Sequence, residues 1–402
     1  MLYRTHVMSA LEARREQFVS FERSMRDEVG ELAARLRALS GRTAREVSRE
    51  AGGRVTYPSD ELERAGGPLA PFAERWRSHE EARRWALSVL SNRATFAADG
   101  SQLFPGREAS LPVAAVQVAS FENPHAPEGR YFKDVHFEVI TPDELRAGGR
   151  GFDSPEQVVG ARRFELEAEA VCAFLERRRG WRSRGERAPV AFFDNTLVFS
   201  SPRGDSETFF SKRYASALAR LITLSRETET PVVGYIDHSY APDVRDLLEA
   251  FYKDLPETNV YDAQILSARP SDGSGPLLGA WGDRTIFWHC RRRSLAPSFY
   301  GEDGAPLVGF VYLQTTADGS PARLDIPAWV HEAGMLEEVV DAVRAECVVG
   351  NGYPYAVETA DEAAVMTARD REQFLRVMQD FAAQHQLDFR LSRKPASKAR
   401  RR

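Results

Sequence analysis

The sequence predicts an α/β fold in which a mixed sheet is flanked by helices, with a helical region ahead of it. Two observations support this prediction: the order of the apolar runs along the chain, and the aspartate with which three of these runs end. The three runs are Thr95–Asp99, Val190–Asp194 and Val232–Asp237. Apolar runs of this length, bounded by turn residues, are typical of buried strands.

The first three predicted strands form a meander. They cover Thr95–Asp99, Val113–Phe121 and Tyr131–Ile140. The segments between them are short and contain proline and glycine, which favours turns and antiparallel pairing of consecutive strands. The meander therefore predicts three neighbouring antiparallel strands.

Helices and strands alternate after the meander. The predicted order is a helix over Pro155–Arg179, a strand over Val190–Asp194, a helix over Glu207–Arg226 and a strand over Val232–Asp237. Later predicted elements are strands over Thr285–Trp288 and Leu307–Thr315 and helices over His331–Val348 and Asp361–Gln384. The order up to Asp237 is that of an RNase H-like sheet, in which the first and fourth strands are neighbours. We therefore expect Asp99 and Asp194 to lie close together.

The predicted domains are a helical assembly region over 1–93, an RNase H-like domain over 94–389 and a basic tail over 390–402. The assembly region has two predicted helices, Leu11–Leu39 and His79–Asn92. The first helix carries an apolar stripe that includes Phe18, Phe21, Met25, Leu32 and Leu36. A stripe on so charged a helix needs a partner, which is either the chain's own sheet or a second copy of the chain.

The aspartates Asp99, Asp194 and Asp237 are candidate ligands of a divalent metal ion. A buried strand holds its last residue still, and carboxylate oxygens are the ligands that hard divalent cations prefer. The pair Asp99-Gly100 is also an ordinary turn dipeptide, which needs no metal. Mg²⁺ or Mn²⁺ suits a site made only of oxygen ligands, whereas zinc prefers histidine or cysteine.

The long helix after the meander supplies a fourth candidate ligand, Glu167. Its apolar stripe consists of Phe164, Ala168, Val171 and Leu175. Glu167 falls within this stripe, whereas Glu165 and Glu169 point to the polar side. A carboxylate on an apolar face is costly unless it is paired or binds a cation. Either a metal ion or an ion pair with Arg163 or Arg178 explains its position.

Composition narrows the class of protein. The chain has 402 residues, a formal net charge of −5 and three cysteines that form neither a disulfide framework nor a Cys-x-x-Cys zinc spacing. It has no G-x-x-x-x-G-K-[ST] motif, so any motor would come from a partner. No apolar stretch approaches the roughly 20 residues that span a bilayer, and we expect a cytoplasmic location. The tail over 390–402 carries seven Lys or Arg and no acid, as in a solvated arm or one that binds phosphates.

Four motifs resemble the successive motifs of the NurA nuclease family. They are Ala97-Ala98-Asp99-Gly100-Ser101, Arg162-Arg163-Phe164-Glu165-Leu166-Glu167, Phe193-Asp194-Asn195-Thr196-Leu197 and Gly352-Tyr353-Pro354-Tyr355-Ala356-Val357-Glu358-Thr359-Ala360-Asp361. They occur in the family's order, and the resemblance runs from about Phe96 to about Phe381. It implies catalytic roles for Asp99, Glu167, Asp194 and Tyr353. Many relatives carry a histidine eight residues after the tyrosine. This chain has Asp361 there, which ranks below the three carboxylates as a catalytic candidate.

The resemblance implies a manganese-dependent DNA nuclease that works with the hexameric HerA translocase in double-strand break repair. Its implied activities are 5′-to-3′ end resection and single-strand endonuclease and exonuclease cleavage. The chain has no ATPase motif, and its N-terminal region is predicted to be helical. We therefore expect a nucleoid-associated homodimer that docks on such a translocase. Two alternatives stay open: a non-catalytic RNase H-like scaffold that binds DNA or the motor, and a nuclease that acts on RNA.

Overall fold

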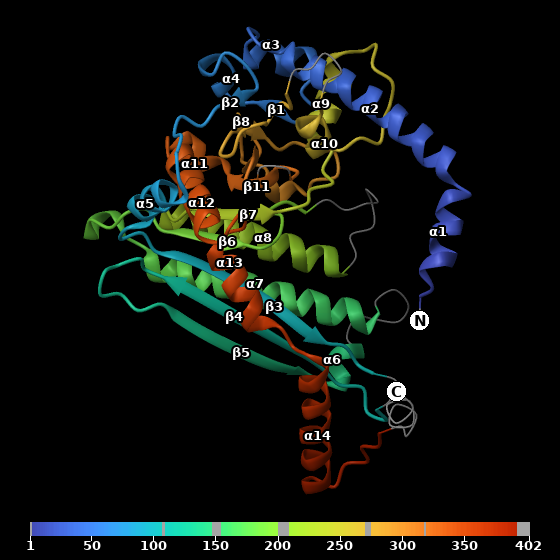
Figure 1. Ribbon diagram of the computed structural model, residues 1–402. Coiled ribbons are helices and arrows are strands. Elements are labelled where there is room, and N and C mark those ends of the chain that lie inside the picture. The colour runs from blue at the N-terminus through green and yellow to red at the C-terminus, as the bar shows by residue number, and fades with distance from the viewer. Residues whose placement is uncertain are drawn as a thin grey trace. The chain divides into compact units, whose positions relative to one another are not determined.

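The computed structural model describes residues 2–106, 109–146, 154–199, 209–269, 275–316 and 319–391. The chain divides into two compact units (Figure 1). Unit 1 comprises Met1–Arg75, Ile236–Arg293 and Gly309–Leu324, and unit 2 comprises Trp76–Tyr235, Ser294–Val308 and Asp325–Arg402. None of the helices in the described part of the chain has the length and apolar character that crossing a bilayer requires.

The sheet of unit 2 has the predicted RNase H-like arrangement. Its strands are β3 (Thr95–Leu103), β4 (Ala114–Asn123), β5 (Phe132–Ile140), β6 (Val190–Phe193) and β7 (Val232–Ile236). They lie in the order β7-β6-β3-β4-β5, with β3, β4 and β5 as an antiparallel meander and β6 parallel to both β3 and β7. The first and fourth strands of the predicted order, β3 and β6, are therefore neighbours, as the sequence predicted.

Two long helices cover one face of this sheet. Helix α7 (Pro155–Arg178) packs on β3, β4 and β6 and against helix α8 (Phe209–Thr228) (Figure 1). It begins with a capping box, in which the Ser154 hydroxyl accepts from the Gln157 N–H and the Gln157 side chain accepts from the Ser154 N–H. The stripe predicted from the sequence is buried along its length, so the predicted helical phase of α7 is confirmed.

The remaining helices of unit 2 lie mainly towards the C-terminal end of the chain. They are α5 (His79–Leu90), α6 (Pro142–Arg146), α11 (Ala328–Glu332), α12 (Leu336–Val349), α13 (Tyr355–Ala364) and α14 (Ala368–Gln384), with short 3-10 turns at Arg182–Arg184 and Pro297–Phe299. Two predictions were wrong here, because the expected helices 331–348 and 361–384 are each interrupted. Gly334 in a left-handed conformation (φ 68°) ends α11, and Thr367 caps a new helix after α13.

Unit 1 is built from short elements around the N-terminal helices. Its helices are α1 (Arg4–Glu12), α2 (Arg15–Arg37), α3 (Ala44–Glu50), α4 (Glu61–Arg64), α9 (Asp243–Phe251) and α10 (Asp262–Ser267), and its strands include β1 (Tyr57–Pro58), β2 (Leu69–Ala70), β8 (Arg284–Thr285) and β9 (Trp288–His289). Strands β10 (Val308–Leu313) and β11 (Ala322–Pro327) cross the boundary between the units along the chain. The strand predicted over Thr285–Trp288 is thus two short strands, and the helix predicted over Leu11–Leu39 is interrupted after Glu12.

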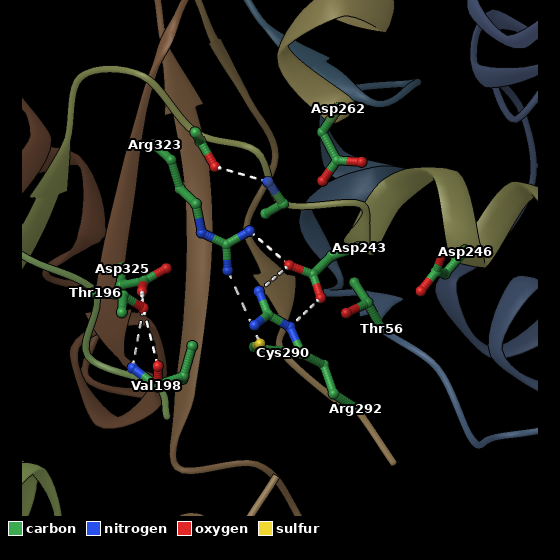
Figure 2. Close-up of polar contacts among 12 residues, drawn as sticks. Thr56, Thr196, Val198, Asp243, Asp246, Asp262, Cys290, Arg292, Arg323 and Asp325 are labelled. Atoms are coloured by element: carbon green, nitrogen blue, oxygen red, sulfur yellow. Dashed lines mark hydrogen bonds and ion pairs between the residues drawn. The ribbon is translucent and has the colours of Figure 1, made fainter. Parts of the chain in front are cut away.

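A buried ion cluster ties together three segments of unit 1 (Figure 2). Asp243, the first residue of α9, accepts hydrogen bonds from Arg323 Nη1 of β11 (2.6 Å) and from Arg292 Nε (2.7 Å) and Nη2 (2.6 Å). Burial alone would raise the pKa of Asp243, but the two guanidinium groups outweigh it and hold that pKa at about 2. The carboxylate is therefore fully paired, as a buried charge has to be.

Candidate active site

Asp99 lies within a strand and not at its end. The predicted strand end at Asp99 was wrong, because β3 continues to Leu103 and its pairing with β4 runs through Asp99↔Ala119 and Gly100↔Val118. What ends at this point is the parallel pairing with β6, whose last pair is Ala98↔Phe193. Asp99 and Asp194 each follow that last pair, so the end of the parallel pairing brings them together.

Gly100 is an extended strand residue, and the glycine turn expected there is absent. A Cβ atom at Gly100 would lie 2.6 Å from Oε1 of Glu167 and 2.8 Å from Cγ of Arg163, both on helix α7. No side chain could occupy that space without displacing one of them. The missing Cβ is therefore what lets a carboxylate of α7 lie directly against β3.

Glu167 is buried, with 5% of its surface exposed. Nη1 of Arg163 lies 3.3 Å from Oε1 of Glu167 and also donates to the Gly100 carbonyl at 2.9 Å. Burial raises the pKa of Glu167 to about 8; Arg163 opposes this shift, and the charges of Asp99 and Asp194 add to it. Of the two arginines considered as partners, Arg163 is the one engaged.

The two neighbouring glutamates of α7 face elsewhere. Glu165 forms a two-point ion pair with Arg213 of α8. Glu169 is exposed, and its Oε1 lies 3.4 Å from Nη1 of Arg162. Glu167 is therefore the one of the three that reaches β3.

Asp194 follows β6 directly and is held by a tyrosine from the other end of the chain. The Tyr353 hydroxyl donates to Oδ1 of Asp194 at 3.0 Å, and the Tyr353 ring packs edge-on against Tyr235, with ring centroids 5.0 Å apart. Tyr353 stands in a tight turn between α12 and α13, in which Gly352 adopts a φ of 109°. We call Asp99, Glu167 and Asp194 the acidic centre.

Asp361 belongs to the same neighbourhood through helix α13, which packs on β3 and β4. Because side chains alternate along a strand, Asp99 shares a face with Ser101, whose hydroxyl donates to the Ala364 carbonyl at the end of α13. Burial, together with the charges of Asp194 and Asp361, raises the pKa of Asp99 to about 6, against a backbone hydrogen bond from Gly100 and the charge of Arg163. Asp361 thus adds negative charge on the α13 side of Asp99.

The fourth predicted ligand, Asp237, falls in unit 1, whereas the acidic centre lies in unit 2. Asp237 follows β7 directly, and its Oδ2 lies 2.8 Å from Nδ1 of His238. Most of the predicted basic tail, from residue 392 onwards, lies outside the described residues.

Sequence reasoning missed two buried acids that position the centre. Oδ2 of Asp325 accepts from the Thr196 hydroxyl (2.6 Å) and from the Leu197 N–H (3.0 Å), so it anchors the loop that follows Asp194 (Figure 2). The same loop lies close to β7, since a Cβ at Gly234 would meet the Asn195 carbonyl oxygen at 2.6 Å. Contacts with both β11 and β7 therefore hold the loop that follows Asp194.

The second missed acid is Glu346 of α12, which is 1% exposed. It accepts from the Thr95 hydroxyl at the start of β3 (2.8 Å) and from the Ala356 N–H in the first turn of α13 (2.9 Å), and its Oε1 lies 3.6 Å from Nε2 of His125. Glu346 thus links the strand of Asp99 to the helix of Asp361. In the sequence, the buried position of Glu346 was indicated only by its being a lone acid within an apolar helical stripe.

Comparison with known proteins identifies the family. The profile of the NurA domain matches residues 93–366. The chain belongs to the NurA family. It is accordingly a nuclease, a phosphodiester hydrolase, as the four motifs predicted. No curated protein matches the chain.

Solved structures similar to the chain include NurA with manganese and NurA bound to dAMP and manganese. Each has 9% sequence identity to this chain and covers 72% of it; the first has a TM-score of 0.42 over 89% of its own length and the second 0.43 over 88%. The catalytic domain of human endonuclease V has 16% identity and a TM-score of 0.33, over 83% of this chain and 95% of its own. Likeness at this level adds nothing to the family assignment.

The NurA resemblance implies a divalent metal ion, and the donors of the acidic centre are of the right chemistry. All three are carboxylates, and Oε1 of Glu167 is buried without a hydrogen-bond partner among the described residues. Tyr353 and Arg163 nevertheless hold Asp194 and Glu167. Nor are any three His, Cys, Asp or Glu side chains of the described ranges gathered so as to hold an ion. The three carboxylates are chemically suited to a cation. They would have to move closer together to coordinate one ion.

Proposed function

We propose that the chain is a divalent-metal-dependent DNA nuclease that resects DNA ends in the 5′-to-3′ direction, with the acidic centre as its catalytic site. The observation that supports this is that carboxylates from β3, α7 and the end of β6 interact electrostatically beside a glycine that leaves room for Glu167. Buried acids that raise one another's pKa are unfavourable until a cation compensates them. Such clusters are characteristic of sites that hold divalent ions.

The residues of the centre have distinct proposed roles. Asp99, Glu167 and Asp194 would hold the ion, for which Mn²⁺ is the choice that the family resemblance implies and Mg²⁺ suits the same oxygen donors. When bound, the ion supplies the Lewis acid that activates water and neutralises charge on the phosphate. The Tyr353 hydroxyl orients a phosphate oxygen or a water molecule. The charge of Asp361, on α13, acts on Asp99 and would strengthen the negative potential that retains a cation.

A cleavage assay with matched substrates tests this proposal. Labelled single- and double-stranded DNA and RNA of one sequence are incubated with the full chain in Mn²⁺ and in EDTA. We expect Mn²⁺-dependent DNA cleavage that is lost in Asp99→Asn and in Asp194→Asn. The metal-free melting temperature of both variants should hold or rise, because each change removes one of several repelling carboxylates.

The alternatives give different results in the same assay. Cleavage of RNA alone would favour the ribonuclease, and DNA binding without any cleavage would favour the scaffold. Full activity in Asp99→Asn would show that the catalytic site lies elsewhere.

We further propose that the nuclease is a homodimer that works with a HerA-type hexameric translocase at the nucleoid. The exposed part of the α2 stripe supports this, since Phe18 is 56% and Phe21 is 65% exposed. Leu32 and Leu36 of the same stripe are 1% and 0% exposed, so they belong to the core of unit 1. The C-terminal part of the stripe thus packs within the chain itself, and only its exposed part is proposed as a self-association surface.

The double variant Phe18→Ser/Phe21→Ser tests the interface without removing core residues. Light scattering should give a dimer for the natural chain at micromolar concentration and a monomer for the variant. Leu87→Ser, which changes an exposed leucine (61%) of α5, is the matched control and should stay dimeric. A monomeric natural chain would exclude the dimer and leave the nuclease proposal standing.

A further inference from the structure

Unit 1 contains a hollow of about 600 Å³ between helix α3 and strand β1. Eight residues line it: Ala44, Arg45, Ser48, Arg49, Gly52, Gly53, Tyr57 and Pro58. None of them is acidic, and two are arginines. All eight residues belong to unit 1, whereas the residues of the acidic centre belong to unit 2.

One face of α3 supplies the cationic wall of this hollow. Arg45, Ser48 and Arg49 recur at the spacing that places residues on one side of a helix. Both arginines are exposed. The guanidinium of Arg45 has no ion-pair or hydrogen-bond partner among the described residues, and Arg49 has only a glutamate oxygen of Glu50 at 3.9 Å. Both groups are therefore available to an anion.

Among the described residues, neither acid of α3, Glu46 or Glu50, accepts a hydrogen bond from Arg45 or Arg49. Glu46 is engaged in the capping box of α3, where it accepts from the Thr43 N–H at 3.0 Å. That backbone hydrogen bond is the main cause that lowers the pKa of Glu46, and the charges of Arg42 and Arg49 lower it further. The lining of the hollow carries two guanidinium groups and the hydroxyls of Ser48 and Tyr57, and it has no carboxylate.

The opposite wall is fixed in place. The Tyr57 ring stacks on His289 with centroids 4.8 Å apart, and the Arg291 guanidinium lies 5.2 Å from the Tyr57 centroid. Nη1 of Arg291 also donates to the Gly53 carbonyl at 2.8 Å. Gly52 and Gly53 have φ values of 80° and 65°, and a Cβ at either would meet nothing within 4 Å. The hydrogen bond from Arg291 thus holds the Gly52-Gly53 turn in place, and the space beside these two glycines is open.

We propose that this hollow binds phosphate groups of a nucleic-acid strand. The proposal rests on the nuclease function above, and it adds a strand-holding surface in unit 1. A guanidinium group has a planar fork of donors that matches two phosphate oxygens, and Arg45 and Arg49 stand one helical turn apart. Contacts from arginine to phosphate carry no sequence information, so the proposed contact is independent of sequence and sensitive to salt.

The test is a binding measurement that needs no cleavage. A fluorescein-labelled 20-mer of thymidylate is titrated with the full chain in EDTA, and anisotropy gives the affinity at several NaCl concentrations. The slope of log K against log salt is negative, and its magnitude falls by about 0.7 for each single-strand phosphate contact that is lost. Arg45→Ala/Arg49→Ala should therefore reduce the slope by about 1.4 and weaken binding at 50 mM NaCl on the order of 10-fold.

The matched control removes two arginines that already have acidic neighbours on the same part of the chain. Arg15 and Arg26 lie 3.7 Å from Glu12 and 2.7 Å from Glu22, respectively, and both are exposed. Arg15→Ala/Arg26→Ala should leave the slope unchanged. An unchanged slope in Arg45→Ala/Arg49→Ala, or an equal loss in the control, would overturn the proposal.

A second readout separates this proposal from the nuclease proposal. Hydrolysis of thymidine 5′-monophosphate p-nitrophenyl ester in Mn²⁺ requires no long strand, so Arg45→Ala/Arg49→Ala should keep the natural kcat and KM. Loss of this hydrolysis in the variant would place the arginines in the catalytic machinery and contradict a strand-holding role. If the natural chain hydrolyses nothing, the nuclease proposal fails, while the anisotropy measurement still decides whether the hollow binds a strand.

Discussion

The substitution Gly100→Ala tests how the acidic centre is assembled. The new Cβ would lie 2.6 Å from Oε1 of Glu167, whereas ordinary contacts begin at 3.4 Å, so the carboxylate has to move by about 0.8 Å. Cγ of Arg163, at 2.8 Å, has to move as well. Overpacking of this kind costs about 1–3 kcal/mol. We expect the lower end, because the first atom displaced is the tip of a flexible side chain.

The effect on catalysis should be much larger than the effect on stability. A displacement near 1 Å in a positioned group can reduce a rate about 100-fold, and Glu167 is one of three proposed metal ligands. We therefore expect the kcat/KM for single-stranded DNA in Mn²⁺ to fall about 100-fold. Urea unfolding in EDTA, followed by circular dichroism, should show a loss of only about 1 kcal/mol.

Gly160→Ala, on the same helix, is the matched control. Its Cβ would meet only the Tyr214 hydroxyl, at 3.7 Å, which is an ordinary contact. Alanine in a helix interior should stabilise the chain by about 0.5–1 kcal/mol and leave cleavage unchanged. Natural activity in Gly100→Ala, or an equal loss in Gly160→Ala, would refute the argument that a missing Cβ makes room for Glu167.

Three further predictions concern buried and surface acids. Glu167→Gln should be almost inactive, whereas Glu165→Gln and Glu169→Gln should cleave DNA at near-natural rates; an inactive Glu165→Gln would contradict the orientation of α7. In EDTA, burial raises the pKa of Glu167 from 4.5 to about 8, so the folded chain holds this proton more tightly than the unfolded chain. Stability should therefore fall as pH rises from 4.5 to 8, and melting curves of Glu167→Gln should show a flatter dependence. Glu346→Ala leaves a buried hydroxyl and a buried N–H without their acceptor, which should cost about 2–4 kcal/mol in urea unfolding, and Glu346→Gln should recover part of it.

The order of the elements could be predicted because each one shows its own periodicity. The meander and the alternation after it are local patterns, and in unit 2 they place β3 beside β6 as expected. The extent of β3 could not be predicted in the same way. Asp99-Gly100 has the local composition of a turn, yet β4 continues to pair with β3 as far as Leu103. Tertiary pairing overrode the local preference.

The positioning acids could not be predicted because their partners are distant in the sequence. Asp325 and Thr196 are 129 positions apart, and Glu346 and Thr95 are 251 positions apart. The sequence shows only that each acid interrupts an apolar element. Such an interruption predicts a buried polar partner without identifying it.

The position of the acidic centre follows from the alternation of side chains along β3. Asp99 lies on the face of Thr95 and Ser101, which bond to α12 and α13, whereas Gly100 lies on the face of Phe96, whose ring stacks on Phe174 of α7. Carboxylates from opposite layers of a sheet are normally separated by a row of side chains. Here the row is interrupted at Gly100, just where the pairing with β6 ends, so Glu167 lies against β3 and its charge interacts with those of Asp99 and Asp194. The glycine next to the aspartate is therefore as necessary to the centre as the carboxylates, although it contributes no ligand.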